Sequence, residues 1–380
     1  MKVYIGCFGS GLGHATRMLA IADILRGRGD EVEFSSSGEV ASFIETRGYR
    51  CNKLPLADVA YSEEGALSLR RTMLQSPSTL GRTCLQVGME LSNVERFRPD
   101  VVLSDSAVST VVAARLAGVR VCAVLNQLNL SARKENMGAA ALLLSEGLSA
   151  GMAKLWGLCD RILLPDLPPP YTISESSLRR PMYSRAHFVG FLTDASETIP
   201  DEATMAFSSD RRPRVFWQIS GPPLTRGPLV RKAREIASQL AGEFSFVLTF
   251  GNPKGGHRPK RFSGGWEYEW CESSSLLLES CDVVVSRAGH GTIANSILSS
   301  KPSLLTPIHG QTEQEGNAAK AVRLGIALSV GLSDLSPEAA REALNELLTE
   351  DYKERSRHLG AIARGYDARS EIVRIIDGRA

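Results

Sequence analysis

The strongest chemical signal in the sequence is a glycine-rich turn at residues 286–292, with the sequence Ser-Arg-Ala-Gly-His-Gly-Thr. The apolar run 281–285 predicts a strand before it, and a helix is expected over 291–299. Such a turn leaves unpaired backbone N–H groups at the positive end of the helix dipole, where an anion can bind. We therefore predict a phosphate or diphosphate site formed by Gly289, His290, Gly291 and Thr292.

Arg287 places a permanent positive charge beside this turn. A guanidinium next to exposed N–H groups would strengthen the binding of a diphosphate, and the alternative is an ordinary surface ion pair. The side chain of His290 could point away from the anion while its backbone binds it.

A second glycine-rich turn near the N-terminus presents a histidine. Gly9 and Gly11 have the spacing of a dinucleotide fingerprint, but that motif needs a third glycine at position 14, where His14 stands. The strand expected over 31–35 also ends in serines rather than in an acid that could bind a ribose. The turn therefore predicts a flexible loop that holds His14 at the mouth of a sheet, and not an NAD site.

His14 and Asp105 together could perform acid–base chemistry. An imidazole titrates near neutrality and can take a proton from a hydroxyl group. Asp105 follows an expected strand at 101–104 and could orient His14. Two other interpretations stay open: His14 could cap its helix or only bind, and Asp105 could be the N-cap of a helix over 108–117, a position that aspartate favours.

Length and composition indicate a globular protein with two domains. The chain has 380 residues, and this length is more than one ordinary core accommodates. Hydrophobic residues make up 43% and charged residues 23%, which is typical of a globular protein. A net charge of +2 gives no reason to expect nucleic-acid binding. The seven cysteines form no C-x-x-C pair, so we expect reduced thiols in the cytoplasm and no zinc site. No leader segment is expected, and the apolar stretches are shorter than the ~20 residues that a membrane span needs.

Strands and helices alternate along the chain, which predicts parallel sheets covered on both faces. In the first half, strands are expected at 2–6, 31–35, 101–104, 121–125 and 161–164, with helices at 14–27, 38–47, 83–96 and 108–117. In the second half, strands are expected at 214–219, 245–250, 266–270, 281–285 and 303–306, with helices at 228–241, 291–299, 313–323 and 336–349.

We therefore predict an α/β protein with two Rossmann-like, doubly wound domains that face a cleft. The N-terminal domain is expected over 1–190 and the C-terminal domain over 191–360, with a hinge near 189–191. A terminal helix at 364–376, within the segment 361–380, could pack back across the hinge. Ligands of such sheets bind at the carboxyl ends of the strands.

The C-terminal half resembles the nucleotide-sugar domain of GT-B glycosyltransferases. The resemblance is carried by residues 286–292, by the Lys-Pro-Ser-Leu-Leu-Thr-Pro segment at 301–307, and by the His-Gly-Gln-Thr-Glu-Gln-Glu-Gly-Asn-Ala segment at 309–318. These segments are similar to those of the bacterial enzyme that adds N-acetylglucosamine to the undecaprenyl-linked muramyl precursor, and of the UDP-glycosyltransferases. The glycine loop before His14 is similar to the first loop of the same families.

The resemblance implies a role for each matching position. Arg287, the turn at 289–292 and the loop glycines Gly11 and Gly13 would bind the donor diphosphate. His309, Glu313 and Gln314 would bind the donor sugar. The nucleoside would contact Ser220, Gly221, Trp270, Cys271 and Asn295. Asn295 stands where the families usually have a glutamate that binds the ribose hydroxyls. An asparagine can form hydrogen bonds to these hydroxyls, but without the charge assistance of a carboxylate. His14 is expected to be the base, with Asp105 orienting it.

The resemblance implies an inverting glycosyltransferase that uses a UDP-sugar and a hydroxyl acceptor, with no cofactor and no metal ion, since no Asp-x-Asp motif follows a strand. Two alternatives remain: a UDP-sugar 2-epimerase on the same scaffold, and a nucleotide-sugar-binding protein without catalysis. The apolar residues at 138–156, with Arg133 and Lys134 at their edge, predict either a core helix or a surface for a lipid-linked acceptor. The second interpretation would place the protein peripherally at the inner face of the cell membrane.

Overall fold

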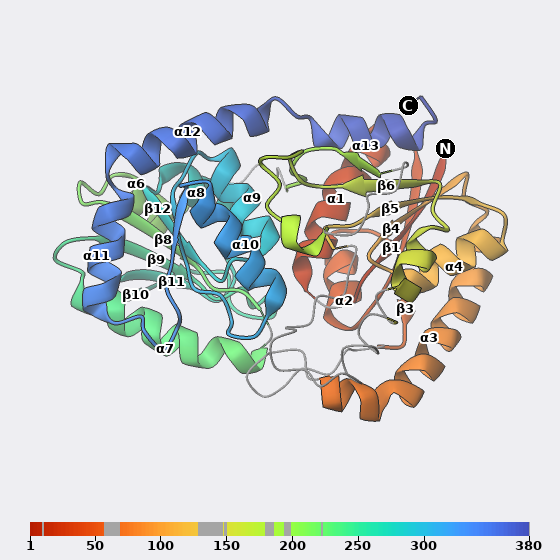
Figure 1. Cartoon of the computed structure of the whole chain (residues 1–380), viewed down its shortest axis with the longest axis horizontal. Coiled ribbons are helices and arrows are strands. Elements are labelled where there is room, and N and C mark those ends of the chain that lie inside the picture. Colours follow the sequence, from red (N-terminus) through yellow and green to blue (C-terminus); the bar gives the residue numbers. More distant parts are fainter. Residues whose placement is uncertain are drawn as a thin grey trace.

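A computed structural model of the chain describes residues 1–9, 11–56, 69–127, 147, 150–178, 186–193, 199–221 and 223–379. Within these residues the strands form two sheets, each with α-helices on both faces, and the two units lie side by side (Figure 1). The prediction of two Rossmann-like domains is confirmed.

The first sheet has the strand order β3-β2-β1-β4-β5-β6-β7, and all its pairs are parallel. Its elements are β1 (Lys2–Cys7), α1 (Leu12–Gly27), β2 (Glu31–Ser37), α2 (Gly38–Thr46), β3 (Cys51–Leu54), α3 (Leu69–Phe97), β4 (Val101–Asp105), α4 (Val108–Leu116), β5 (Arg120–Val124), β6 (Arg161–Leu164), η2 (Glu175–Ser177) and β7 (Ala186–Phe188).

The second sheet has the order β10-β11-β9-β8-β12-β13-β14. The strands and helices of this unit are α6 (Glu202–Ser208), β8 (Arg214–Gln218), α7 (Pro223–Gln239), β9 (Ser245–Thr249), β10 (Lys260–Phe262), β11 (Gly265–Tyr268), α8 (Ser274–Ser280), β12 (Val283–Ser286), α9 (His290–Leu298), β13 (Ser303–Leu305), α10 (Thr312–Arg323), β14 (Ala327–Ser329), α11 (Pro337–Leu347) and α12 (Glu350–Arg364). The last helix, α13 (Ala368–Ile376), packs on the first domain. The edge strand β10 pairs antiparallel with β11, whereas the other pairs are parallel.

Each sheet has a point at which the strand order reverses, and this point fixes the place of the candidate site. In the first sheet the reversal lies between the neighbouring strands β1 and β4, and in the second between β8 and β12. Loops at such a switch point diverge and leave room for a ligand beyond the carboxyl ends of the strands. The loop that carries His14 follows β1, and the turn that carries Arg287 follows β12.

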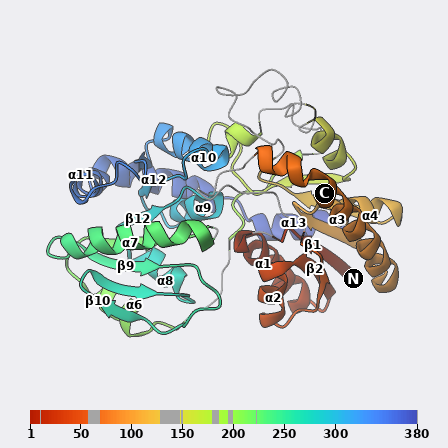
Figure 2. The same ribbon diagram turned by 90° about the horizontal axis from the view of Figure 1, so that it is seen from below.

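The terminal helix expected over 364–376 is present but begins four residues later, because Arg364 is the last residue of the preceding helix. α12 ends at Arg364, and α13 begins at Ala368. The side chain of Asp367 accepts a hydrogen bond from the backbone N–H of Ser370 (3.1 Å) and so caps a new helix. α12 lies on the second domain and α13 on the first, so the chain returns to the domain in which it began (Figures 1 and 2).

Apolar side chains from α13 complete the core of the first domain. Ala368, Ile372, Ile375 and Ile376 are buried against residues of α1 and β1. The guanidinium of Arg120 donates to the backbone carbonyl of Ile376 (2.9 Å), and Arg28 pairs with Asp377 (2.6 Å). The C-terminal helix is therefore part of the packing of the N-terminal unit.

Candidate active site

Neighbouring strands bring His14 and Asp105 together, although 91 positions separate them. Cys7 at the end of β1 lies beside Asp105 at the end of β4, and the backbone N–H of Phe8 donates to the Asp105 carbonyl (3.0 Å). The chain then turns at Gly11, which has a φ of +90° and precedes α1. His14 lies in the first turn of this helix, and its Nδ1 is 2.8 Å from Asp105 Oδ1.

Asp105 does not cap the following helix, so that alternative is wrong. α4 has Ala107 at its N-cap position and no side-chain cap. The Asp105 carboxylate is fully buried and is instead bonded to His14 and Arg17. Ser106, the next residue, has a φ of +56°, an unfavourable conformation for a side chain other than glycine. The strained turn aims the carboxylate at α1.

Arg17 is a member of this site that the sequence analysis missed. Its Nε and Nη2 donate to the two carboxylate oxygens of Asp105, and Nη2 also lies 3.0 Å from His14 Nδ1. Burial alone would raise the pKa of Asp105, but the charges of Arg17 and His14 hold it at about 2. A signal was present in the sequence, because positions 14 and 17 are three apart and share one face of a helix.

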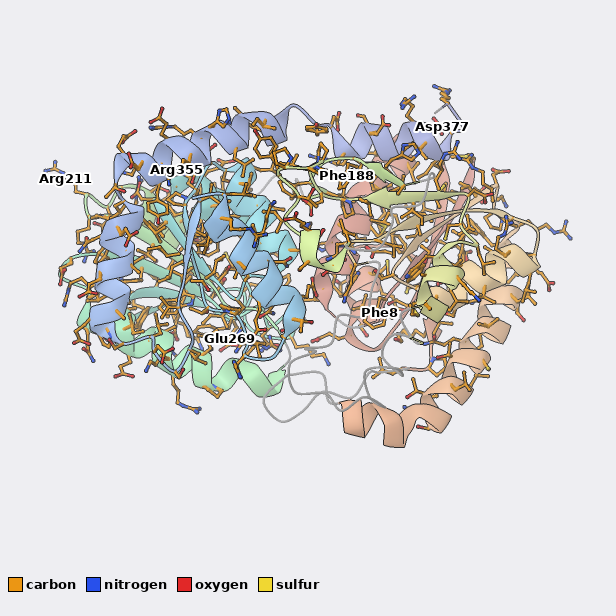
Figure 3. The ribbon with its side chains drawn as sticks, viewed as in Figure 1. Phe8, Phe188, Arg211, Glu269, Arg355 and Asp377 are labelled. Carbon is orange, nitrogen blue, oxygen red and sulfur yellow. The ribbon has the colours of Figure 1, made fainter. Side chains whose placement is uncertain are left out.

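The hydrogen bond to Asp105 leaves the second nitrogen of His14 for chemistry. An ionised carboxylate only accepts, so Nδ1 of His14 carries the hydrogen, and in the neutral form of the imidazole Nε2 keeps a lone pair. The ring of Phe8 meets the imidazole edge-on, with centroids 5.6 Å apart. The His14 side chain is 21% exposed, so a substrate can reach it. Figure 3 shows Phe8 on the side of the first domain that faces the second.

In the second domain, the turn after β12 leads directly into the N-terminus of α9. Gly289 is the N-cap residue of α9, with φ −63° and ψ 137°, and no side chain caps the helix. Ala288 has a φ of +59°, and the side-chain amide of the buried Asn317 donates to its carbonyl (3.2 Å). A Cβ added at Gly289 or at Gly291 would meet no atom within 4 Å. The fold therefore does not require glycine at either position, whereas the close approach of a ligand would.

Arg287 lies beside this turn, next to a second arginine that the sequence analysis missed. Arg287 is 3% exposed, and its Nη1 donates to the carbonyl of Ser220 (3.3 Å). Arg226 of α7 donates to the carbonyls of Phe250 (3.1 Å) and Gly251 (2.6 Å). Burial and the charge of Arg226 lower the pKa of Arg287 to about 10, which leaves Arg287 positively charged at neutral pH. This end of the sheet is strongly cationic.

The side chain of His290 points away from the predicted anion site. Its Nε2 lies 3.1 Å from Oδ2 of Asp166, a buried residue of the loop after β6 in the first domain. Asp166 also accepts hydrogen bonds from the backbone N–H groups of Leu167, Ile173 and Ser174, at 2.8–3.0 Å. Only the backbone of His290 is thus left for an anion, and its ring connects the two domains.

The residues expected to bind the donor sugar differ in their surroundings. The Nδ2 of Asn126, just after β5, lies 3.4 Å from Oε1 of Glu313, so Glu313 faces the first domain. The side-chain oxygen of Gln314 accepts a hydrogen bond from the backbone N–H of Ile308 (2.9 Å) and so holds its own loop. His309 is 90% exposed and lies 3.8 Å from Glu315.

The predicted nucleoside residues gather near the carboxyl ends of β8, β11 and β12. The ring of Trp270 packs edge-on against Phe43 of α2, with centroids 5.6 Å apart. The Trp270 ring therefore spans the junction between the domains, which differs from a simple base-stacking platform. Cys271 is half-buried with its Sγ 3.5 Å from Ser273 Oγ, and burial raises its pKa to about 11. Ser220 and Gly221 follow β8, and Asn295 lies in the second turn of α9.

Two further features of the described residues bear on the expected chemistry. In the ranges that the structure describes, no three His, Cys, Asp or Glu side chains gather into a metal-ligand set. None of the described helices is long and apolar enough to cross a membrane. Most of the apolar segment 138–156, with Arg133 and Lys134, lies outside the described residues. Trp156, at its end, is buried in the core of the first domain.

Comparisons with known proteins cover both halves of the chain. The glycosyltransferase family 28 C-terminal domain matches residues 228–371, and glycosyl transferase family 1 matches residues 1–153. An uncharacterized glycosyltransferase from Methanosarcina mazei is 26% identical over 385 residues, which cover 100% of this chain and 99% of the relative. The UDP-N-acetylglucosamine--N-acetylmuramyl-(pentapeptide) pyrophosphoryl-undecaprenol N-acetylglucosamine transferase of Methylobacterium radiotolerans is 23% identical, covering 87% of this chain and 85% of that enzyme.

A solved structure shows the same arrangement of domains. The glycosyltransferase of Streptomyces sp. SF2575 in complex with thymidine diphosphate superposes with a TM-score of 0.68 at 17% identity, covering 100% of this chain and 99% of that one. The two facing sheets and the family matches together define a glycosyltransferase with the GT-B fold. Within that class, the C-terminal half of the chain is similar to the glycosyltransferases of family 28, whose C-terminal domain matches residues 228–371.

Proposed function

We propose that this chain is an inverting, metal-independent glycosyltransferase that moves a hexosyl or N-acetylhexosaminyl group from a UDP-sugar to a hydroxyl acceptor. The observation that carries the proposal is the presence of two complementary sites on facing domains. A histidine oriented by a buried carboxylate lies at the switch point of the first sheet. A helix N-terminus with two arginines lies at that of the second.

The cationic turn after β12 favours a nucleoside diphosphate as the donor's leaving group. Backbone N–H groups of α9 and the guanidinium of Arg287 would bind the diphosphate oxygens. The structural neighbour bound to thymidine diphosphate and the relative named for UDP-N-acetylglucosamine support this class of ligand. We expect uracil as the base, near Trp270 and Cys271, and Asn295 on the ribose. N-acetylglucosamine, glucose and galactose are the first sugars to test.

His14 would begin the reaction by taking a proton. Its Nε2 accepts the proton of the acceptor hydroxyl, and that oxygen forms a bond to the anomeric carbon of the sugar. The bond between this carbon and the diphosphate oxygen breaks on the opposite face, so the configuration inverts. The electron pair leaves on the diphosphate, where the α9 N-terminus, Arg287 and the neighbouring charge of Arg226 stabilise it. Asp105 stabilises the imidazolium that forms.

The two domains would divide the substrates between them. We assign the acceptor to the N-terminal domain, expected over 1–190, and the donor to the C-terminal domain, expected over 191–360. Glu313 and Gln314 face the sugar hydroxyls in this arrangement, with His309 at the rim. The glycines of the first loop, Gly11 and Gly13, would approach the diphosphate from the other side, and a Cβ at either position meets no protein atom within 4 Å.

A hydrophobic or lipid-linked acceptor remains part of the proposal through the segment 138–156. Flotation of the whole chain with vesicles that contain anionic lipid tests a peripheral membrane contact. Co-flotation is expected if the segment faces the lipid surface, and its absence would remove this part of the proposal.

The function is tested by assaying a panel of UDP- and TDP-sugars for transfer, with the products identified by NMR. Selective stabilisation by one nucleotide sugar in a thermal-shift assay is expected to identify the donor.

His14→Ala should lower transfer about 10²–10⁴-fold while nucleotide affinity stays near the parent value. The exposed His257 provides the control variant. Full transfer by His14→Ala would contradict the assignment of the base. An epimerised sugar without acceptor would indicate an epimerase, and binding without turnover a non-catalytic protein.

A further inference from the structure

Arg17 has no assigned role in the reaction proposed for His14 and Asp105. Among the charged side chains of α1, Arg17 is buried, with 8% of its surface exposed. Both oxygens of Asp105 accept hydrogen bonds from one edge of its planar guanidinium, and Nη2 on the same edge lies 3.0 Å from His14 Nδ1. A single guanidinium thus contacts both members of the candidate acid–base pair.

This contact matters because a histidine beside an unpaired carboxylate becomes a poor base near neutral pH. A negative charge within about 4–6 Å stabilises the protonated imidazolium, and an imidazole that already holds a proton cannot accept one from the substrate. A positive charge at a similar distance has the opposite effect. The buried contacts between Arg17, Asp105 and His14 place both charges beside one ring.

We propose that Arg17 is a positioning residue that offsets the negative charge of Asp105 and so keeps His14 neutral and able to accept a proton. The inference rests on the proposed function, since it assigns His14 as the base. Arg17 touches neither the donor nor the acceptor in this proposal, and it acts through the Asp105 carboxylate and by its own charge.

Titratable groups from three other elements lie around Arg17 and His14. Cys7 on β1 is buried, and burial raises the pKa of its thiol well above the ordinary value, so it contributes no charge. Asp105 on β4 is ionised. Glu313 on α10 belongs to the second domain, and its negative charge acts on Arg17 across the junction. The charge of Glu313, a residue assigned to the donor sugar, therefore also influences Arg17.

The test compares how the histidine rings titrate by NMR in the parent and in variants at position 17. The His14→Ala variant identifies the His14 signal among the six histidines. In Arg17→Gln, and in Arg17→Met, which fills the buried space without a charge, the His14 ring is expected to gain its proton about 1–2 pH units higher than in the parent. Arg17→Lys keeps the charge and is expected to stay closer to the parent.

An unchanged or lower titration midpoint in a folded uncharged variant would overturn the proposal, as would an equally large shift in Arg17→Lys. Thermal melting establishes that each variant is folded, and the methionine variant supplies the measurement if the glutamine variant is not. In the transfer assay, the acidic limb of the kcat/KM profile should move upward by the same amount, with UDP affinity within about twofold of the parent value.

The two proposals fail in distinguishable ways. The NMR titration needs no sugar donor, so it reports on Arg17 even when no transfer is detected. Loss of the expected shift would refute the role of Arg17 and leave the proposed transfer reaction intact. Full transfer by His14→Ala would refute the reaction while leaving the measured titration unaffected.

Discussion

Arg287 lies in surroundings that disfavour its own charge. Burial and the neighbouring charge of Arg226 both lower its pKa, and a bound diphosphate would reverse that effect. We expect Arg287→Ala to weaken UDP binding by about 2 kcal/mol, roughly 30-fold, because it removes charge-assisted hydrogen bonds. Isothermal calorimetry measures this change. Arg211, exposed at the outer end of the second domain (Figure 3), provides a matched control, and an equal loss in Arg211→Ala would contradict the assignment.

Glu90 on α3 is a buried carboxyl group that should make stability depend on pH. It accepts hydrogen bonds from Tyr4, Ser35 and Thr110, yet burial raises its pKa. The folded chain then binds the Glu90 proton more tightly than the unfolded chain. The stability that this provides is complete below the unfolded pKa and is lost as the pH rises through the folded pKa.

Glutamine at this position imitates the protonated carboxyl group. The free energy of unfolding of Glu90→Gln should therefore fall less than that of the parent when the pH is raised from 5 to 8. Urea titrations at several pH values measure the difference. Glu342→Gln, at an exposed position on α11, should follow the parent. Parallel curves for the parent and Glu90→Gln would refute the expected linkage.

At the scale of the elements, the N-terminus of α9 allows binding to be separated from stability. Gly289→Ala adds a methyl group in open space at a favourable φ, so stability should stay constant or rise by up to about 1 kcal/mol. The same methyl group would occupy space assigned to the diphosphate, and UDP affinity should fall about 10–100-fold. Calorimetry and thermal melting measure the two effects.

Gly316→Ala on α10 is the matched control, because there the added methyl group is expected to lower stability rather than UDP affinity. A Cβ there would lie 2.0 Å from Ser176 Oγ and 2.9 Å from Ser176 Cβ. Overpacking of this kind destabilises by about 1–3 kcal/mol. A folded Gly289→Ala variant with parent-like UDP affinity would show that the diphosphate does not approach this turn.

Much of the fold was predictable because the apolar strands and the helices have clear periods. The sequence predicted most of the strands around both switch points, and the turns at 9–13 and 286–292 follow strands that meet there. The short strands β3, β7, β10 and β14 were not predicted, whereas β13, which has only three residues, was. β10 has three residues, is largely exposed and contains two cations, and β14 also has only three residues. Strands of this length form through their neighbours rather than through local preference.

The site residues in turns and at strand ends could be predicted from the sequence, whereas most contacts between residues far apart in the sequence could not. His14 and Asp105 follow predicted strands, so their meeting could be inferred from the sheet. Arg17 and Arg226 lie within helices, where a charged residue usually faces solvent. The spacing of positions 14 and 17 places Arg17 on the helix face of His14, but no such local signal indicates the contacts of Arg226. The bond between His290 and Asp166 joins residues 124 positions apart in different domains. Such contacts are set by how the domains pack, which no local pattern encodes.

At the scale of the whole molecule, the His290–Asp166 contact connects the donor helix to the first domain. Asp166 is buried and its pKa is lowered, since the charge and hydrogen bond of His290 outweigh the effect of burial. Asp166→Asn should destabilise the chain by about 2–4 kcal/mol and also weaken UDP binding, because α9 loses the anchor of its first residue. Asp351→Asn, at an exposed position on α12, should change neither property.

Thermal melting and calorimetry measure both effects of Asp166→Asn. A loss of stability with parent-like UDP affinity would mean that the contact holds the loop after β6 and does not act on the donor helix. The contribution of the ionised Asp166 is fully present above the ordinary aspartate pKa and is lost as the pH falls through the lowered pKa of the folded chain, so the parent and the variant should converge in acid.

The polypeptide passes between the domains twice, and the two passages touch. Gly190, with a φ of +87°, lies so close to Tyr366 that a Cβ on the glycine would be 2.4 Å from the Tyr366 Cβ. Two neighbouring segments of the chain thus join the domains, so we expect any relative movement of the domains to be a rotation about these segments. Chimaeras that exchange donor-binding halves between relatives should therefore keep residues 366–379 with the N-terminal parent, because the apolar side chains of α13 are buried in the core of that domain.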